Sequence, residues 1–353
     1  EAKAFANKNL ADLSLPAISV GEALLAMLSH PDIASKEWVY RQYDHMVQTN
    51  TVIPPGADAA VIRVTGSNLG IAVATDGNGR YCEADPFQGG AIAIAEATRN
   101  LICVGAEPVA LSDCLNFGDP EKPGVAFQLE QCIQGMRAAC LALDVPVISG
   151  NVSLYNETRG EAIYPTPVIG SVGLVDDINL ALRPGFKQAG DLVLLLGSGT
   201  MDRDPQDLAA SLALEELHGT SGKMLTIDLD LETRLQKACL ALIREGMIES
   251  AHDCSDGGLG VALAESCMPL SVGFSLETPL PERWDAALFS ETQSRVIISV
   301  RSEKLKDVVQ AITRNQVPWM SLGHTTVGDL KLGETSLTIP ELAKAFTSRL
   351  ASV

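Results

Sequence analysis

One repeated order of segments constrains the fold more than any other feature: a short β-branched run ends in a polar loop, and a helical run follows. EPVALSDCLNFG (107–118) and VPVISGNVSLYNE (145–157) each run into such a loop, and residues 124–143 between them have amphipathic helical spacing. The same patterns predict strands at 59–64, 70–76 and 166–177, and an Ala-rich helix at about 86–104. This order predicts a mixed α and β fold with polar loops at the strand ends.

A Pro- and Gly-containing stretch, RPGFKQAGD (183–191), predicts a domain boundary. The part beyond it alternates strands and helices again, with helices expected at 205–217 and 228–246, which predicts an α/β or α+β domain. Ahead of the first strands, helical spacing recurs at 19–30 and at 35–47, with Ser35 as a candidate cap of the second helix. We therefore expect lead-in and linker helices at 1–50, a first domain at 51–183 and a second at 184–353.

The charge and cysteine content narrow the classes of function. A net charge of −18 repels polyanions and argues against nucleic-acid binding, although backbone amides and Mg²⁺ can still hold a small phosphate. The eight cysteines form no CxxC and lie mostly in apolar runs, so we expect free thiols in a reducing cytosol and no zinc site. No apolar run reaches about 18 residues, so we expect no membrane span. The sequence does not begin with Met, and we expect a processed chain or a piece of a longer protein.

The most suggestive local cluster is SGNVSLYNE (149–157), at the end of a predicted strand. Gly150 would let a ligand approach the backbone, the Asn151 amide oxygen suits Mg²⁺, and the Ser153 hydroxyl could bond a phosphate or substrate oxygen. An ordinary Asn/Gly turn explains the same residues equally well.

Three further segments place an Asp beside Gly or Asn. Asp113 could bind a ribose hydroxyl, an adenine amino group or a metal-bound water, although a loop cap is the simpler explanation. Asp58 and Asp76 could hold Mg²⁺, with Arg80 meeting a phosphate, or could belong to common Asp-Gly turns.

SDGGLGVALAE (255–265) is a Gly loop that opens a helix, where backbone amides favour an anion. Ser255 or Asp256 could instead be the N-cap, with Gly257 and Gly258 allowing close packing. No GxxxxGK[ST], GxSxG or Cys–His pair occurs in a motif context, so we assign no catalytic residue. We assign structural roles to His45 and His252.

Taken together, these segments carry a resemblance. PGADAAV, DGNGRY, AIAEATRNLICVGAEPVALSDCLNFGDPEKP, PVISGNVSLYNET, YPTPVIG, AHDCSDGGLGVALAES and FSETQSR occur in that order. They resemble the second half of the synthetase subunit of the phosphoribosylformylglycinamidine synthase family, from about residue 12 to the end. The LNFGDPEKP and GNVSLYNE strings carry it most specifically.

The resemblance implies a fold and a reaction. It implies an α+β unit: a ferredoxin-like N-domain that pairs through its sheet as a dimer or pseudo-dimer, followed by an α/β C-domain. It implies an ATP-dependent ligase of purine biosynthesis that converts formylglycinamide ribonucleotide to formylglycinamidine ribonucleotide. ATP would activate the amide oxygen, and ammonia made from glutamine by a glutaminase would displace the phosphate, with Mg²⁺ and backbone amides stabilising charge.

Motif by motif, the resemblance places Asp113 and Gly150 at nucleotide-contacting positions, Asn151 at a Mg²⁺ position and Ser153 at a substrate position. It associates the loop of Ser255, Asp256, Gly257 and Gly258 with nucleotide phosphates at an auxiliary site, and Asp58 and Asp76 with metal there. The family's catalytic histidines lie in a first unit that this sequence lacks. We therefore expect a chain that needs an N-terminal synthetase half, a glutaminase subunit and a small accessory subunit, and that is inactive alone.

Two other functions stay open. A free-standing homodimeric ATP enzyme of the same superfamily would need a full catalytic set in one unit. A non-catalytic scaffold that holds ADP or ATP would need none. A homodimer through an exposed sheet edge is a separate expectation.

Overall fold

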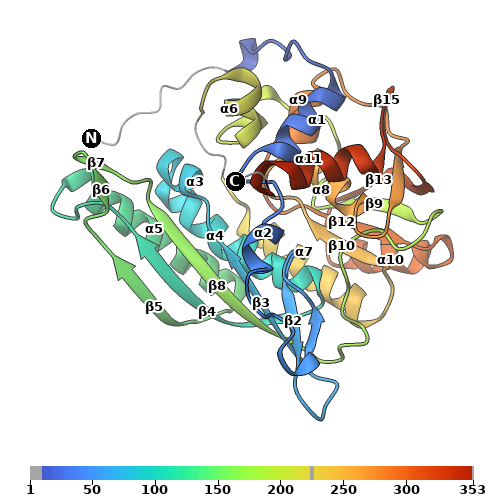
Figure 1. Ribbon diagram of the computed structural model, residues 1–353, viewed down its shortest axis with the longest axis horizontal. Helices are drawn as coiled ribbons and strands as arrows, with labels where there is room; N and C mark the ends of the chain where they lie inside the picture. Colours follow the sequence, from blue (N-terminus) through green and yellow to red (C-terminus); the bar gives the residue numbers. More distant parts are fainter. Residues whose placement is uncertain (1–9, 223–225, 352–353) are drawn as a thin grey trace.

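The computed structural model describes residues 10–222 and 226–351, which build two sheets with helices packed against them (Figure 1). The first sheet is formed by residues 51–175 and the second by residues 192–337. The predicted boundary at 183–191 lies between the last strand of one sheet and the first strand of the other. The expected α+β class is confirmed, and the exact domain bounds stay a prediction.

The first sheet has six strands in the order β1-β2-β3-β8-β4-β5. Its neighbours pair antiparallel except β4 and β5, which are parallel. The strands are β1 Thr51–Ile53, β2 Ala60–Arg63, β3 Gly70–Asp76, β8 Thr166–Val175, β4 Glu107–Asn116 and β5 Val147–Ser153, and β6 Glu157–Thr158 and β7 Glu161–Ala162 form a small hairpin beside it. Because β4 and β5 are parallel, the chain must cross over between them, and a long helix forms this connection.

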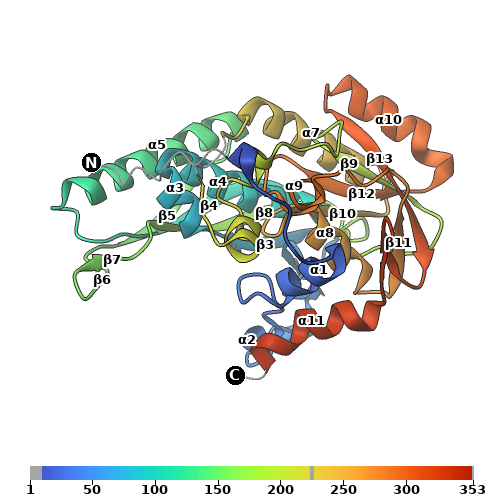
Figure 2. The ribbon, with the colours of Figure 1, turned by 90° about the horizontal axis from the view of Figure 1, so that it is seen from above.

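Three helices cover one face of this sheet (Figure 2). They are α3 Gly79–Ala84, α4 Pro86–Cys103 and α5 Pro123–Leu143. Helix α4 begins cleanly because the Asp85 carboxylate accepts a hydrogen bond from the Gln88 amide (3.1 Å) and Pro86 occupies the first turn. Its many alanines are buried, which lets α4 approach both the sheet and α5 closely.

The opposite face of the first sheet is apolar and exposed. Strand β3 alternates buried and exposed residues, and register pairs Ile71 with Ile62 and Leu174, and Val73 with Val172. All five side chains are exposed although they are β-branched or Leu. A contiguous apolar sheet face without a covering layer is the kind of surface that another protein segment buries.

The second sheet has seven strands in the order β10-β12-β9-β13-β11-β14-β15 and is antiparallel except for β11 with β14. Its strands are β9 Leu192–Leu196, β10 Ser250–Asp253, β11 Val272–Leu276, β12 Val296–Val300, β13 Trp319–Val327, β14 Leu330–Leu332 and β15 Thr335–Leu337. Its helices are α6 Leu212–His218, α7 Leu229–Arg244, α8 Gly258–Cys267, α9 Trp284–Phe289, α10 Leu305–Arg314 and α11 Ile339–Ala351. Short 3₁₀ helices are η1 Leu10–Asp12, η2 Val47–Thr49, η3 Pro205–Leu208 and η4 Ser302–Lys304.

The lead-in helix α1, Val20–Ser29, belongs to the core of the second half. It is capped by Ser19 and Glu22 in a reciprocal capping box, and it packs against α11 and α8 through Leu24 and Met27. His30 ends it, as the sequence indicated. The segment that precedes the first sheet therefore packs against the C-terminal part of the chain.

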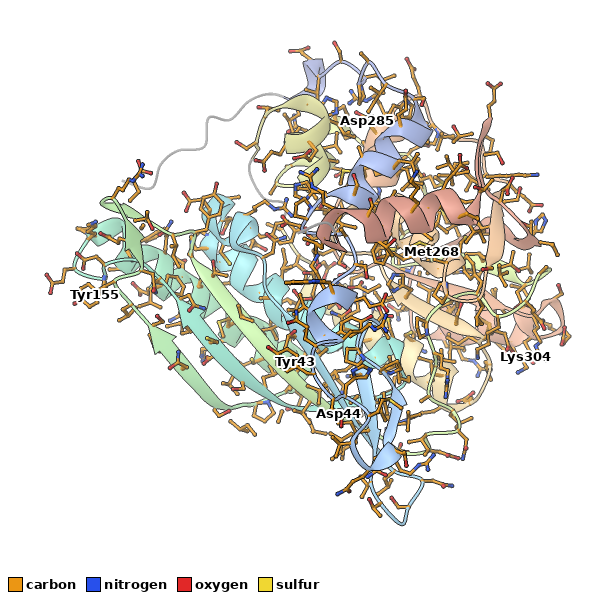
Figure 3. The ribbon with its side chains drawn as sticks, viewed as in Figure 1. Tyr43, Asp44, Tyr155, Met268, Asp285 and Lys304 are labelled. Atoms are coloured by element: carbon orange, nitrogen blue, oxygen red, sulfur yellow. The ribbon has the colours of Figure 1, made fainter. Side chains whose placement is uncertain are left out.

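Two predicted helices are shorter than expected. The helix expected at 35–47 is reduced to α2, Glu37–Tyr40, because the segment has no core face to bury: Trp38 and Tyr43 are exposed, and Figure 3 labels Tyr43 near β2 and β3. The Ser35 hydroxyl still accepts a hydrogen bond from the Glu37 amide (3.2 Å). The helix expected at 205–217 is split into η3 and α6, since Ala210 takes a positive φ of 56° between them.

Candidate functional site

The parallel ladder between β4 and β5 brings the strongest candidates together. Asp113 is in register with Gly150, and the next pairs place Cys114 beside Asn151 and Asn116 beside Ser153. Strand β5 is the edge of the sheet, and its residues are exposed except for half-buried Ser153. Residues distant in sequence thus form one continuous polar edge.

Gly150 leaves room for the Asp113 carboxylate. A Cβ at position 150 would lie 1.8 Å from Asp113 Oδ1 and 3.0 Å from the Asp113 carbonyl oxygen. Partial burial raises the pKa of Asp113, which its own backbone amide opposes. A ligand group that donates a hydrogen bond to the Asp113 carboxylate would also lie next to the backbone of Gly150, which carries no side chain.

Asn151 and Ser153 differ in how firmly they are held. The Asn151 amide nitrogen lies 3.9 Å from Cys114 Sγ, and within residues 10–222 and 226–351 its amide oxygen accepts no hydrogen bond. The Ser153 hydroxyl donates to Asn156 Oδ1 (3.3 Å), and Asn156 in turn donates to the carbonyl oxygens of Phe117 (3.0 Å) and Ser153 (2.9 Å). The loop is anchored by Asn156, while Asn151 stays available to a ligand.

These residues fit a Mg²⁺ ion that is shared with a phosphate. Mg²⁺ usually keeps several waters and takes only one or two protein oxygens besides those of the phosphates. The Asn151 amide oxygen can supply one such oxygen, whereas the Asp113 side chain points to the other face of the sheet, because Asp113 is in register with Gly150, one position before Asn151. Within the part of the chain that the structure describes, no group of three or more His, Cys, Asp or Glu side chains could hold a metal alone.

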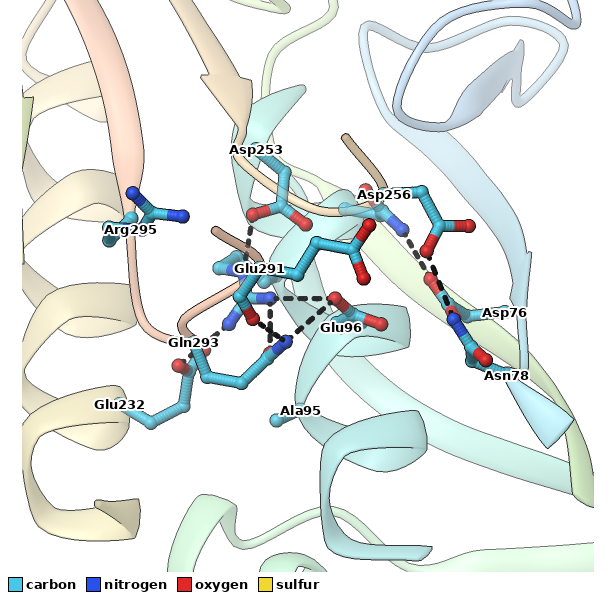
Figure 4. Close-up of polar contacts among 12 residues, drawn as sticks. Asp76, Asn78, Ala95, Glu96, Glu232, Asp253, Asp256, Glu291, Gln293 and Arg295 are labelled. Atoms are coloured by element: carbon cyan, nitrogen blue, oxygen red, sulfur yellow. Dashed lines mark hydrogen bonds and ion pairs between the residues drawn. The ribbon is translucent and has the colours of Figure 1, made fainter. Parts of the chain in front are cut away.

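A second polar cluster lies at the seam between the two halves (Figure 4). The Asp256 carboxylate accepts hydrogen bonds from Asn78 Nδ2 (3.0 Å) and Arg80 Nη2 (3.1 Å), which joins the end of β3 to the loop before α8. These residues line a hollow of about 560 Å³, together with Lys36, Gly77 and others. The hollow is large enough for a nucleotide-sized ligand.

The Gly loop at 255–258 is shaped by its own glycines. Gly257 and Gly258 have φ of 77° and 66°, and a Cβ at 258 would lie 2.3 Å from the Ser290 carbonyl oxygen. The Gly257 amide donates to Glu291 Oε1 (2.9 Å), so Glu291 occupies one amide of the loop that we expected to meet a phosphate. Glu291 also accepts from the Tyr81 hydroxyl (2.6 Å) and the Leu212 amide (3.0 Å).

Burial gives this cluster carboxyl groups that titrate near neutrality. Desolvation, with the nearby Asp256 and Asp253, raises the pKa of Asp76 to about 7. Desolvation and Asp256 likewise raise the pKa of Glu291 to about 7 against the opposing effect of Arg80. A divalent cation or a proton would stabilise carboxyl groups that lie this close together.

Comparisons with known proteins agree with this architecture. The family model "AIR synthase related protein, N-terminal domain" matches residues 56–175, and "AIR synthase related protein, C-terminal domain" matches residues 188–333. The chain belongs to the AIR synthase-related family.

Curated relatives within this family share a name. The phosphoribosylformylglycinamidine synthase subunit PurL of Moorella thermoacetica is 50% identical over 332 residues, which cover 92% of this chain and 44% of that protein. PurL of Alkaliphilus metalliredigens is 45% identical over 314 residues, 89% of this chain and 42% of that protein. The resemblance to the phosphoribosylformylglycinamidine synthase family is therefore confirmed, and the chain spans less than half the length of these two relatives.

Solved structures share the fold of this chain. T. maritima PurL complexed with FGAR matches with a TM-score of 0.71 at 17% identity, covering 92% of this chain and 53% of that one. Thiamine-monophosphate kinase from Stenotrophomonas maltophilia matches with a TM-score of 0.55 at 18% identity, covering 83% of this chain and 94% of that one. Among the residues that the structure describes, no helix is both long enough and apolar enough to cross a membrane.

Asp58, another predicted metal ligand of this AIR synthase-related chain, contacts His252 and Asp253. Its carboxylate accepts from the Asp253 amide (3.1 Å) and lies 2.9 Å from His252 Nδ1, while His252 Nε2 lies 3.1 Å from Glu265. Despite its burial, His252 has a pKa well above its usual value because Asp58 and Glu265 stabilise the imidazolium. The role of Asp58 as a metal ligand stays a prediction, and His252 has the structural contacts that we expected.

Sequence reasoning missed the buried centre of the seam. Arg99 Nε donates to Asp253 (2.5 Å), Nη1 to Glu232 (2.8 Å) and Nη2 to Gln293 (3.0 Å). These partners come from more than 130 residues away, so no local spacing could reveal them. Asn78 and Glu291 were also missed, although both lie inside segments that carried the family resemblance. An Arg within an Ala-rich helix that is predicted to be buried was one available signal.

Proposed function

We propose that this chain is the C-terminal, nucleotide- and substrate-binding half of phosphoribosylformylglycinamidine synthase, a ligase that forms a C–N bond with glutamine as the amide donor. The supporting observation is identity of 45–50% to PurL over about nine-tenths of this chain, combined with coverage of less than half of PurL. The whole enzyme would convert formylglycinamide ribonucleotide to formylglycinamidine ribonucleotide in purine biosynthesis, in the cytoplasm.

The edge of the first sheet would supply the binding groups. Asp113 and the bare backbone at Gly150 would orient the nucleotide, and Asn151 would hold Mg²⁺ against its phosphates. Ser153, positioned by Asn156, would bond the second substrate a few residues further along the same strand. Bound Mg²⁺ would neutralise the charge of the transferring phosphoryl group. The solved PurL structures complexed with ATP, ADP and AMPPCP motivate the choice of nucleotide.

The exposed sheet face supports the need for an N-terminal half. Its apolar side chains, Ile62, Ile71, Val73, Val172 and Leu174, are contiguous by strand register and lack a covering layer in the described part of the chain. A related sheet from the first unit would bury them and complete the site. The glutaminase and small accessory subunits would then supply ammonia to the assembled enzyme.

One observation favours a second function for the isolated chain. The hollow of about 560 Å³ between Lys36, Arg80 and Asp256 has mixed charge and is lined by none of the site residues of β4 and β5, so a nucleotide could be held there without turnover. In that case the chain would be a nucleotide-holding scaffold. A free-standing homodimeric enzyme is the third candidate, and it would turn over substrate without any added unit.

The deciding experiment combines this chain with a separately made N-terminal half and follows ammonia-dependent ADP release with formylglycinamide ribonucleotide. We expect no activity from either half, activity from the mixture, and a loss of at least tenfold in the mixture with Asn151→Ala. The matched control is Asn315→Ala, which removes an Asn at the end of α10 whose side chain donates to the Ala311 carbonyl oxygen (2.9 Å). Activity in this chain alone would refute the half-enzyme proposal and favour the free-standing enzyme. Binding of Mg-ADP without activity in the mixture would favour the scaffold.

A further inference from the structure

A groove lies where the loop between the two sheets passes the first sheet. It has a volume of about 400 Å³ and is lined by Arg63 of β2, by Arg183 and Lys187 of the connecting loop, and by Leu270 after α8. The apolar side chains of Val52 and Ile178 complete its wall. A second hollow of about 620 Å³ shares Arg63 and Ile178 with the groove and extends it to the turn at 66–68.

The charge of this groove is opposite to that of the chain. Three cationic side chains line the groove and no carboxylate does, although the whole chain carries a net charge of −18. Within residues 10–222 and 226–351, Arg63, Arg183 and Lys187 form no side-chain hydrogen bond or ion pair with a protein group. An anion in the groove would neutralise three cationic side chains that lack a protein partner in the described part of the chain.

Acidic side chains close to the groove are engaged elsewhere. Arg244 binds Asp176 (2.7 Å), and Asp177 accepts from Asn179 Nδ2 (2.8 Å). Glu249 and Asp191 act on Lys187 at longer range, but Glu249 is paired with Arg301 (3.0 Å) and Asp191 accepts from Gln188 (2.9 Å). Burial also lowers the pKa of Lys187, which an anion beside it would oppose.

We propose that the groove of Arg63, Arg183 and Lys187 binds a small organic molecule that carries a phosphate group. Guanidinium groups match phosphate oxygens with two parallel hydrogen bonds, and a lysine adds a mobile point charge. The volume exceeds that of a phosphate ion, and Val52, Ile178 and Leu270 offer an apolar wall to the rest of the ligand. The groove contains none of the residues to which we assigned nucleotide, metal or substrate binding, so this inference goes beyond the proposed function.

Such a ligand would contact both halves of the chain. Arg63 belongs to the first sheet, whereas Leu270 follows α8 of the second half. The ligand would bind best to one arrangement of the two halves. Its binding would stabilise that arrangement by an amount set by the difference in affinity. The molecule would have a means of responding to a phosphorylated metabolite.

The test uses the full chain with a metal chelator present, so that magnesium-dependent binding is suppressed. Inorganic phosphate and AMP are titrated separately by calorimetry, at low and at high salt. We expect at least one to bind, more weakly at high salt. Arg183→Glu should raise its Kd about tenfold or more, because an attractive charge becomes repulsive. Lys344→Glu, a charge reversal on the exposed face of α11, should leave the Kd unchanged.

The two probes separate the sources of the phosphate. AMP binding more tightly than phosphate means that the apolar wall is used, and equal binding means that the groove recognises phosphate alone; both support the proposal. Absence of binding by either probe at millimolar concentration overturns it, as does an unchanged Kd in Arg183→Glu. Asn151→Ala should bind the probes like the unmodified chain, so that failure here is distinguishable from failure of the proposed function.

Discussion

At the scale of single residues, Gly150 and Asp113 make the sharpest pair. A methyl group at position 150 would occupy the place of Asp113 Oδ1, 1.8 Å away. We expect Gly150→Ala to turn the Asp113 carboxylate away and to weaken Mg-ATP binding by the assembled enzyme about tenfold or more. Stability should fall by no more than about 2 kcal/mol, because the displaced group ends a rotatable side chain.

The control for this substitution lies on β8, which is separated from β5 by β4. A Cβ at Gly170 would lie 3.7 Å from the Ser112 carbonyl oxygen, an ordinary contact, so Gly170→Ala should leave binding intact. Calorimetry gives the affinities, and urea unfolding gives the stabilities. Equal affinities of the two variants would show that the space at Gly150 has no role in binding.

Asp76 and Glu291 predict an unusual dependence of stability on pH. Their pKa values are raised to about 7 in the folded chain, above those of unfolded Asp and Glu, so the folded state holds more protons from about pH 4 to about pH 7. Stability contributed by these groups therefore falls as pH rises through that window. His252, whose pKa is also raised, acts in the same direction, since its folded state favours the protonated form.

Thermal melts at several pH values test this. We expect Asp76→Asn to flatten the fall in melting temperature between about pH 5 and about pH 8 by several degrees, because the amide cannot ionise. Asp202→Asn changes an exposed carboxylate instead and should leave the slope as it is. An Asp76→Asn slope identical to that of the unmodified chain would contradict the raised pKa.

At the scale of elements, the sequence predicted most of the strands and helices but not the ends of those with little to bury. Helix α4 and strand β3 have strong apolar patterns and were found where expected. The 35–47 helix failed because its apolar residues face solvent, and β1 was missed because three residues carry no periodicity. The β4–β5 cluster could be anticipated because its residues belong to two specific motifs, whereas which strands pair depends on the whole sheet.

The exposed apolar face of the first sheet predicts that copies of the isolated chain associate with one another. We expect the isolated chain to self-associate through this face, and Leu174→Lys to give a monomer, since a charge there cannot be buried against a second sheet. Leu141→Lys, on the solvent side of α5, is the matched control and should not dissociate it. Light scattering measures the mass, and a strictly monomeric unmodified chain would count against the prediction.

At the scale of the whole molecule, one buried arginine joins the two halves. Arg99 of α4 is fully buried and pairs with Glu232 of α7 and Asp253 of β10, while Gln236 of α7 also donates to the Ala95 carbonyl oxygen (3.2 Å). These contacts cross the predicted boundary, so they couple the unfolding of the two halves. Because Arg99 and these partners lie more than 130 residues apart, no local segment of the sequence contains this information.

Replacing Arg99 by Met should therefore destabilise the chain by about 3–5 kcal/mol, because Glu232 and Asp253 would remain buried without a counter-charge. Urea unfolding, followed by fluorescence and circular dichroism, should change from one shared transition to two. The double variant Arg99→Met/Glu232→Gln should recover part of the loss, since it removes one of the stranded charges. If Arg99→Met alone still unfolds in one transition at the original midpoint, the arginine does not couple the two halves.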